Sequence, residues 1–335
     1  MSSLSEECGL GRSARTIAAT ASDKAASPLP SIQVGVVGLG HMGGAFARNL
    51  LADGFRVLGI DRDSERVSAL HEEGACATAG LGDVSTCDVV LTSLPDDSAL
   101  QDVALASGGL VDSMRKDSIH ISMSTISPEM SGSLAQAHAA RCQGYVAAPV
   151  LGNPDLARSR KLFVLSAGQR NTIEQVRPVL ERLGQRVFVI SEDPAAANLM
   201  KLAGNVLTAT TLESMGEVLA LLRKGGVNQQ VAFEVLTNSL FDGKVHKTYG
   251  GKILNEQYLP SGMTVPLAVK DLRLALAAAE REAVPMPSAS LVHDRLVGVM
   301  ALGWADLDWS ALGLLAALDA GLGSKFLESE YAGGK

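Results

Sequence analysis

A short β-branched run over residues 34–37 leads directly into the glycine-rich segment Gly38-Leu39-Gly40-His41-Met42-Gly43, and a helical pattern follows. This order of strand, glycines and helix is typical of a turn that cradles a dinucleotide pyrophosphate. Gly38 permits the tight turn, Gly40 lets the backbone approach the phosphates, and Gly43 lets helix and strand pack closely. The free N–H groups of the first helical turn then face the anion. A purely structural glycine turn is the alternative interpretation.

A second predicted strand, residues 55–60, ends in Asp61. In this kind of site, a carboxylate about 20 residues after the first glycine binds the hydroxyl groups of the adenosine ribose. Asp61 favours NAD, because its charge would repel a 2′-phosphate. NADP is the alternative, since the guanidinium of Arg62 can grip a 2′-phosphate in a bidentate manner, although it can equally stack on adenine or stay solvated.

Length and charge restrict the class of protein. A chain of 335 residues predicts two domains. The formal net charge of −7 argues against a nucleic-acid partner, and charges or glycines interrupt every apolar run before it reaches about 18 residues, so no membrane span is expected. Cys8, Cys76, Cys87 and Cys142 form no CxxC pair, which favours reduced thiols in a cytoplasmic protein. We expect a small-molecule substrate and no metal ion.

The N-terminal segment, residues 1–31, is rich in Ser and Ala and ends in Pro28-Leu29-Pro30. We expect a disordered tail. A transit peptide is the alternative, but Glu6 and Glu7 are unusual for one.

Strand-like runs alternate with helical segments over residues 32–192, which predicts a dinucleotide-binding domain with a Rossmann-type, doubly wound sheet. A short strand is expected at residues 75–77. In such a sheet the carboxyl ends of the strands line the ligand crevice. The loops that follow the predicted strands at residues 89–94, 119–121 and 145–147 are therefore candidate walls of the site.

From residue 193 onward the pattern is helical only. Asp193-Pro194 is typical of a helix start and Gly225-Gly226 of a helix end, so residues 193–224 are expected to form one long interdomain helix. Helices at residues 229–238, 265–281 and 288–301 then complete an all-α C-terminal domain, residues 225–330. The predicted fold class is therefore α/β, with an all-α second domain.

Lys201 and Asn205 lie four residues apart on one face of this helix. A buried ammonium can donate a proton to the oxygen of a carbonyl that is being reduced, since burial lowers its pKa. From spacing alone, a solvated lysine and a surface amide are the favoured alternative.

Several motifs recur in a fixed order along the chain: the glycine segment, Leu94-Pro95, Ser124-Thr125-Ile126-Ser127-Pro128, Ala148-Pro149-Val150, Lys201 with Asn205, and Lys270-Asp271-Leu272. Together they resemble the β-hydroxyacid dehydrogenase family, which includes 3-hydroxyisobutyrate dehydrogenase and tartronate semialdehyde reductase and is related to 6-phosphogluconate dehydrogenase. The resemblance covers about residues 32–312. It implies a nicotinamide-dependent oxidoreductase that interconverts a hydroxyl and a carbonyl, assembled as a homodimer or homotetramer.

The resemblance also implies roles for individual residues. Lys201 is expected to be the catalytic acid/base, and Thr125 is expected to lie beside the nicotinamide. The expected substrate-binding residues are Ser124, Gly152 and Asn205. The expected cofactor-binding residues are Gly38, Leu39, Gly40, His41, Met42, Gly43, Asp61, Arg62, Leu94, Pro95, Thr125 and Lys270. An exposed lysine at position 270, and helix-capping roles for Ser124 and Thr125, are the alternatives from the residues alone.

The chain also departs from the family pattern. Leu151 stands where family members that act on small hydroxyacids usually have a carboxylate-binding serine, and Gly204 replaces the first asparagine of an Asn-Asn pair. A bulkier or less acidic carbonyl compound, or a cyclic imine, is therefore a candidate substrate. Imine reductases generally carry Asp or Tyr where this chain has Lys201, which favours carbonyl chemistry. An imine reductase and a non-catalytic NAD(P)-binding module are the alternative functions.

Overall fold

The computed structural model describes residues 32–331, except residues 77 and 79. The tail expected at residues 1–31 lies outside the described residues. Within the described part of the chain, no helix is both long enough and apolar enough to cross a membrane.

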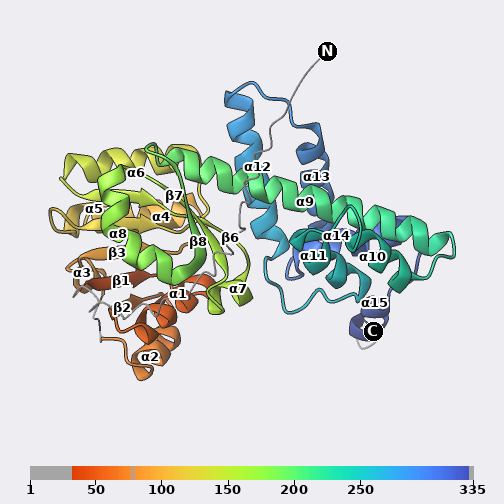
Figure 1. The fold of residues 1–335 in the computed structure, drawn as a ribbon, viewed down its shortest axis with the longest axis horizontal. Coiled ribbons are helices and arrows are strands. Elements are labelled where there is room, and N and C mark those ends of the chain that lie inside the picture. Colours follow the sequence, from red (N-terminus) through yellow and green to blue (C-terminus); the bar gives the residue numbers. More distant parts are fainter. Residues whose placement is uncertain (1–31, 77, 79, 332–335) are drawn as a thin grey trace, which may run out of the picture. The chain divides into compact units, whose positions relative to one another are not determined.

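One sheet of eight strands forms the N-terminal half (Figure 1). The strands are β1 (Gln33–Val37), β2 (Arg56–Ile60), β3 (Val89–Thr92), β4 (Ile119–Ser122), β5 (Gly144–Ala147), β6 (Val150–Leu151), β7 (Leu162–Ala167) and β8 (Gly184–Ser191). Their order is β2-β1-β3-β4-β5-β7-β6, and β8 pairs with β7. The sheet is parallel from β2 to β5, as expected for a doubly wound fold, but β7 runs antiparallel to both β5 and β6. Of the short strand predicted at residues 75–77, the described residues contain an isolated parallel bridge between Cys76 and Leu58, and residue 77 lies outside the described residues.

Helices connect and cover these strands. They are α1 (His41–Ala52), α2 (Ser64–Glu72), α3 (Leu81–Val84), α4 (Asp97–Leu100), α5 (Leu110–Ser113), α6 (Pro128–Ala140), α7 (Pro154–Arg158) and α8 (Arg170–Leu183), with a π-helical turn at Gln101–Leu105. Ser127 caps α6 by accepting a hydrogen bond from the Met130 amide, and Pro128 occupies the first turn, as the sequence predicts.

The C-terminal half is helical. It contains α9 (Ala195–Lys224), α10 (Gln229–Thr237), α11 (Lys244–Leu254), α12 (Val265–Arg281), α13 (Pro287–Ala301), α14 (Leu312–Asp319) and α15 (Lys325–Tyr331), with a 3₁₀ turn at Trp309–Ala311. The helices predicted from the sequence correspond to α9, α10, α12 and α13. The Asp193 carboxylate accepts a hydrogen bond from the Ala195 amide and so caps α9.

Helix α9 takes part in both halves of the molecule, and Figure 1 shows it running from beside the sheet into the group of C-terminal helices. Near its start, Ala197 belongs to the hydrophobic core of the sheet half, together with Ala147 and Leu165. Further along, Ala209 and Leu212 belong to the core of the helical half. Lys201 therefore lies on the segment of α9 that passes from one core to the other.

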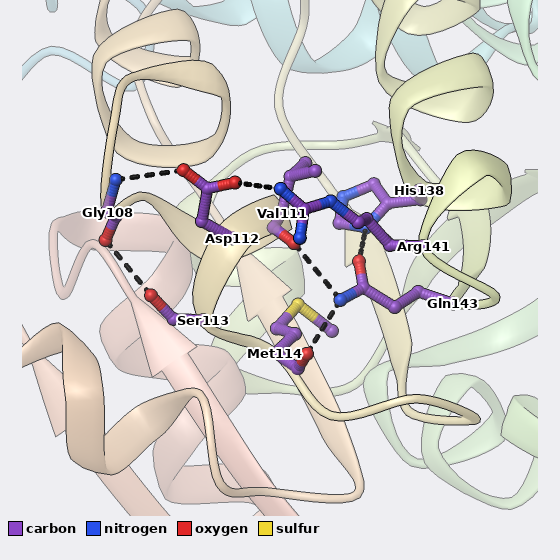
Figure 2. Close-up of polar contacts among 8 residues, drawn as sticks. All are labelled: Gly108, Val111, Asp112, Ser113, Met114, His138, Arg141 and Gln143. Carbon is purple, nitrogen blue, oxygen red and sulfur yellow. Dashed lines mark hydrogen bonds and ion pairs between the residues drawn. The ribbon is translucent and has the colours of Figure 1, made fainter.

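A chain of buried polar side chains links β3 and β4 to α6. The amide nitrogen of Gln143 donates hydrogen bonds to the carbonyls of Val111 and Met114, which leaves its oxygen to accept from Nδ1 of His138 at 2.7 Å (Figure 2). Neutral His138 then accepts at Nε2 from Nδ1 of His120, at 2.8 Å, and Nε2 of His120 accepts from the Thr92 hydroxyl, at 2.9 Å. Burial lowers the pKa of His138 to about 4 and keeps both rings neutral.

Candidate active site

Two glycines of the N-terminal turn are required by the packing of the protein itself. Gly38 has a φ of +90°, and a β-carbon there would lie 2.4 Å from the carbonyl oxygen of Ser93. A β-carbon on Gly43 would lie 1.9 Å from the carbonyl oxygen of Gly38. No side chain would fit at either position. The turn therefore holds β1 close to the start of α1.

Gly40 differs from these two glycines. A β-carbon there would meet only the Arg66 guanidinium, at 3.8 Å, so the protein does not itself exclude a side chain. The backbone at Gly40 is open, and α1 begins directly after it, without a side-chain cap among the described residues. Exposed amides at an uncapped helix start, beside an open glycine, fit a phosphate group. The turn therefore fits a dinucleotide pyrophosphate.

Asp61 closes this turn from the end of β2. Its carboxylate accepts hydrogen bonds from the amides of Leu39, at 2.6 Å, and Asp63, at 3.0 Å. Burial acts to raise the pKa of Asp61, but these backbone hydrogen bonds and the positive charge of Arg66 outweigh it, so the pKa is lowered and the group is ionised. The guanidinium beside Asp61 belongs to Arg66, 3.7 Å away, whereas Arg62 is exposed.

The loops after β3 and β4 are joined to each other. The Leu94 amide donates a hydrogen bond of 2.8 Å to the hydroxyl of buried Ser124. Pro95 is exposed beside this contact, and Thr125 is partly buried. The carbonyl oxygen of Thr125 accepts a hydrogen bond of 2.6 Å from the Lys270 ammonium, which comes from α12. The predicted site residues of the sheet half are therefore connected to the helical half.

Lys201 is buried, with 8% of its surface exposed, and it belongs to a chain of polar contacts that links α9 to α12. Its ammonium donates a hydrogen bond of 2.9 Å to the amide oxygen of Asn205. The amide nitrogen of Asn205 donates a short hydrogen bond to one carboxylate oxygen of Asp271. The other oxygen of Asp271 forms an ion pair of 2.8 Å with Lys270, in a geometry that is not that of a hydrogen bond. The structure thus brings the predicted residues Lys201, Asn205, Lys270 and Thr125 into one connected network.

Burial shifts the pKa of this lysine towards neutral pH. It lowers the pKa of Lys201 from 10.5 to about 8, with the Asp271 charge raising the pKa and the neighbouring Lys270 charge lowering it further. An amine with this pKa exchanges a proton readily in both directions near neutral pH.

Gly152 follows β6 and has a φ of +140°. A β-carbon there would lie 2.5 Å from the side chain of Leu162, so local packing alone explains this glycine. The neighbouring Leu151 lies against Gly204 of α9. Strand β6 therefore reaches the same helix that carries Lys201.

Sequence reasoning gave no role to three residues of this region. Asp271 belongs to the Lys270-Asp271-Leu272 motif, and its position next to Lys270 is the only sequence signal for a role. Arg66 lies one helical turn beyond Asp63, which it contacts at 3.1 Å. Asn198 is fully buried one turn before Lys201, and neither polar atom of its side chain has a hydrogen-bond partner among the described residues. In the part of the chain that the structure describes, no three His, Cys, Asp or Glu side chains are grouped to hold a metal ion.

Two family models match the chain. Residues 33–191 match the NAD binding domain of 6-phosphogluconate dehydrogenase, and residues 195–315 match the NAD-binding domain of NADP-dependent 3-hydroxyisobutyrate dehydrogenase.

Known relatives cover the same region. The chain is 36% identical to the uncharacterized oxidoreductase YfjR of Bacillus subtilis, over 84% of this chain and 98% of the relative. It is 30% identical to glyoxylate/succinic semialdehyde reductase 1 of Arabidopsis thaliana, over 84% of this chain and 97% of the relative. A crystal structure of 3-hydroxyisobutyrate dehydrogenase from Salmonella typhimurium superposes with a TM-score of 0.77 at 26% identity, over 85% of this chain and 99% of the other. An imine reductase from a Pseudomonas species, at 22% identity and a TM-score of 0.57, shares the fold alone.

The glycine turn, the ionised carboxylate after β2 and the two-part architecture define a nicotinamide-dependent oxidoreductase, and the family models agree. The enzyme interconverts a hydroxyl and a carbonyl group. The chain belongs to the β-hydroxyacid dehydrogenase family, as its motifs predict.

Proposed function

We propose that this enzyme transfers a hydride between the nicotinamide and the carbonyl carbon of an aldehyde or keto-acid substrate, with Lys201 as the general acid in reduction and the general base in oxidation. The observation that carries the proposal is the buried Lys201 amine, which has a pKa of about 8 and lies where α9 passes between the two cores. When bound, the cofactor supplies the hydride.

The chain's own residues hold and move the proton. Asn205 accepts from the Lys201 ammonium at 2.9 Å and so fixes the direction of the amine. Asp271 accepts a hydrogen bond from the Asn205 amide and so fixes the orientation of Asn205. Its negative charge raises the pKa of Lys201 and partly offsets the lowering that burial causes. Positioning of this kind lets a general acid act without reorganisation.

For substrate binding we propose Ser124, Gly152 and Asn205 beside Lys201. For cofactor binding we propose Gly38, Leu39, Gly40, His41, Met42, Gly43, Asp61, Arg62, Leu94, Pro95, Thr125 and Lys270. Arg66 joins this second group, because its guanidinium lies near both Gly40 and Asp61.

The cofactor that we propose is NAD rather than NADP. The lowered pKa of Asp61 keeps a negative charge at the tip of β2, where a 2′-phosphate would have to sit. Arg62 and Arg66 offer positive charge to a phosphate, but Arg66 already pairs with Asp61 and Asp63.

A panel of aldehydes, keto acids and cyclic imines tests the proposal, with nicotinamide absorbance followed for NADH and NADPH separately. We expect turnover of at least one aldehyde or keto acid with NADH, and turnover slower by a factor of about 10²–10⁴ in Lys201→Met, which should still bind NADH. Turnover of imines alone would favour an imine reductase. If every compound failed while NADH bound, the chain would be a cofactor-binding module.

We further propose that the enzyme is a homodimer or homotetramer that works in the cytoplasm. Large apolar side chains lie exposed on neighbouring helices, among them Leu207 (70%) and Leu221 (71%) of α9 and Val235 (61%) of α10. Such a surface is typical of an interface. The free thiols of Cys76 and Cys87 suit a reducing compartment. A monomeric mass in light scattering at micromolar concentration would contradict the proposed assembly.

A further inference from the structure

Leu151 covers the turn of α9 that carries Lys201. A β-carbon on Gly204 would lie 2.8 Å from a δ-methyl of Leu151, so the leucine rests directly on the helix backbone there. Gly204 lies three residues after Lys201 and just before Asn205, on the adjoining surface of the helix. The leucine is only partly buried, and part of it packs on the core of the sheet half. Its remaining surface is apolar and lies at the helical turn that carries Lys201.

The contact also explains a glycine in the middle of a long helix. Glycine there costs about 1 kcal/mol relative to alanine, so it needs a compensating reason. A side chain at position 204 would have to displace the Leu151 side chain. The two residues are therefore a matched pair, in which the small residue on α9 makes room for the large residue after β5.

Asn153 lies two residues after Leu151, and its side-chain oxygen accepts a hydrogen bond from the Leu156 amide at 3.0 Å. Lys252 is close to this corner, since a β-carbon on Gly262 would lie 3.9 Å from both its ammonium and the β-carbon of Asn153.

Lys252, however, is neutralised. It forms an ion pair of 2.7 Å with Asp308, which is fully buried. Lys270 is likewise paired with Asp271. Lys252 and Lys270 are therefore not free to neutralise a carboxylate placed against Leu151, where the carboxylate would lose part of its hydration.

We infer that the substrate carries an apolar, branched alkyl group next to its reacting carbonyl, and that the Leu151–Gly204 pair selects this group over a carboxylate. This inference rests on the proposed hydride-transfer function. In reduction, the hydride of NADH forms the new C–H bond at the carbonyl carbon, the carbonyl oxygen takes the proton of the Lys201 ammonium, and the products are the branched alcohol and NAD⁺. In the reverse direction the alcohol is oxidised and NAD⁺ reduced.

Isobutyraldehyde and glyoxylate test this inference. Both are aldehydes, and they differ in the group attached to the aldehyde carbon, which is an isopropyl group in the first and a carboxylate of similar size in the second. The measured quantity is the ratio of kcat/KM for isobutyraldehyde to kcat/KM for glyoxylate, compared between variants so that hydration of the aldehydes cancels. We expect Leu151→Ser to lower this ratio at least tenfold, a size typical of discrimination by an apolar pocket. Leu151→Val, which keeps a branched apolar side chain, should retain the wild-type ratio.

Leu105→Ser is the matched control, since Leu105 is also a partly buried leucine packed on the core of the sheet half, in the π-helical turn. It should leave the ratio unchanged. An unchanged or increased ratio in Leu151→Ser would overturn the inference. Wild-type enzyme that reduces other carbonyl compounds but not isobutyraldehyde would overturn the inference alone, whereas no turnover of any carbonyl compound would overturn the proposed function too.

Stability gives a second readout that does not depend on turnover. Gly204→Ala should stabilise the Leu151→Ser background, where the alanine methyl has room and gains helix propensity. In the wild-type background the same change should stabilise less, because the methyl forces the δ-methyl of Leu151 to shift. Equal effects of Gly204→Ala in both backgrounds would show that the two residues are not a pair and would overturn the inference.

Discussion

The pH dependence of turnover should follow the titration of Lys201. With a pKa of about 8, roughly a tenth of the amine is neutral at pH 7, about 300 times the fraction of an ordinary lysine. The kcat/KM for carbonyl reduction, which needs the ammonium, should be constant below about pH 8 and fall above it. The kcat/KM for alcohol oxidation, which needs the neutral amine, should rise up to the same pH and then level off.

Asp271→Asn perturbs this titration without removing hydrogen-bonding capacity, because the new amide oxygen can still accept from Asn205. The charge of Asp271 acts on the Lys201 ammonium across the Asn205 amide and raises its pKa. At an effective dielectric constant of about 20, two opposite charges on the order of 7 Å apart attract by roughly 2 kcal/mol. Removing the Asp271 charge should lower the midpoint of both pH profiles by about one unit or more.

The matched control is Asp155→Asn, which removes an exposed carboxylate on α7. Its midpoint should equal that of the wild type. A midpoint that stays in place or rises in Asp271→Asn would refute the reasoning, and so would a wild-type midpoint near the ordinary lysine value of 10.5.

Three further predictions concern stability and cofactor choice. The pKa of His138 is about 4 in the folded protein and 6.5 in the unfolded chain, so the unfolded chain binds the proton first as the pH falls. The free energy of unfolding should therefore keep its full value above about pH 6.5 and fall by about 3 kcal/mol as the pH drops to about 4. Urea unfolding should show a smaller acid-induced fall in His138→Gln, and equal falls in both proteins would contradict this. Asp61→Asn removes the charge that repels a 2′-phosphate and should raise the ratio of kcat/KM for NADPH to that for NADH at least tenfold, about 1.4 kcal/mol; an unchanged ratio would mean that Asp61 does not choose the cofactor. Asn198→Leu removes a buried amide that has no hydrogen-bond partner within the described part of the chain. It should raise the free energy of unfolding by about 1–3 kcal/mol with turnover retained, whereas lost turnover would show that Asn198 contacts a ligand.

The sequence predicted those features that local patterns determine. The glycine turn and the long helix α9 depend on residues that are neighbours in the chain, so glycine spacing, capping and periodicity are enough to recognise them. Lys201 and Asn205 are four residues apart on α9, and this spacing predicted correctly that they share a face.

Features that depend on contacts between distant segments were missed. The antiparallel pairing of β7 with β5 and β6 is such a feature, because strand order is not encoded in any single run. Arg66 rather than Arg62 reaches Asp61, since the turn into α2 brings the later arginine back towards the end of β2. The role of Asp271 depends on the packing of α12 against α9, which no local pattern shows.

The departures Leu151 and Gly204 were both visible in the sequence, but only as separate differences from the family pattern. Their contact joins the end of β6 to the first third of α9, about 50 residues later in the chain. Volume complementarity of this kind is a property of tertiary packing. It therefore becomes visible only in the structure.

The most direct test of the central claim is a single-turnover measurement of hydride transfer in Lys201→Met, at saturating NADH and a substrate found in the panel. Loss of a positioned general acid should slow this step by a factor of about 10²–10⁴, while the Kd for NADH stays within about threefold of the wild type. Hydride transfer at the wild-type rate in this variant would contradict the assignment of the proton to Lys201.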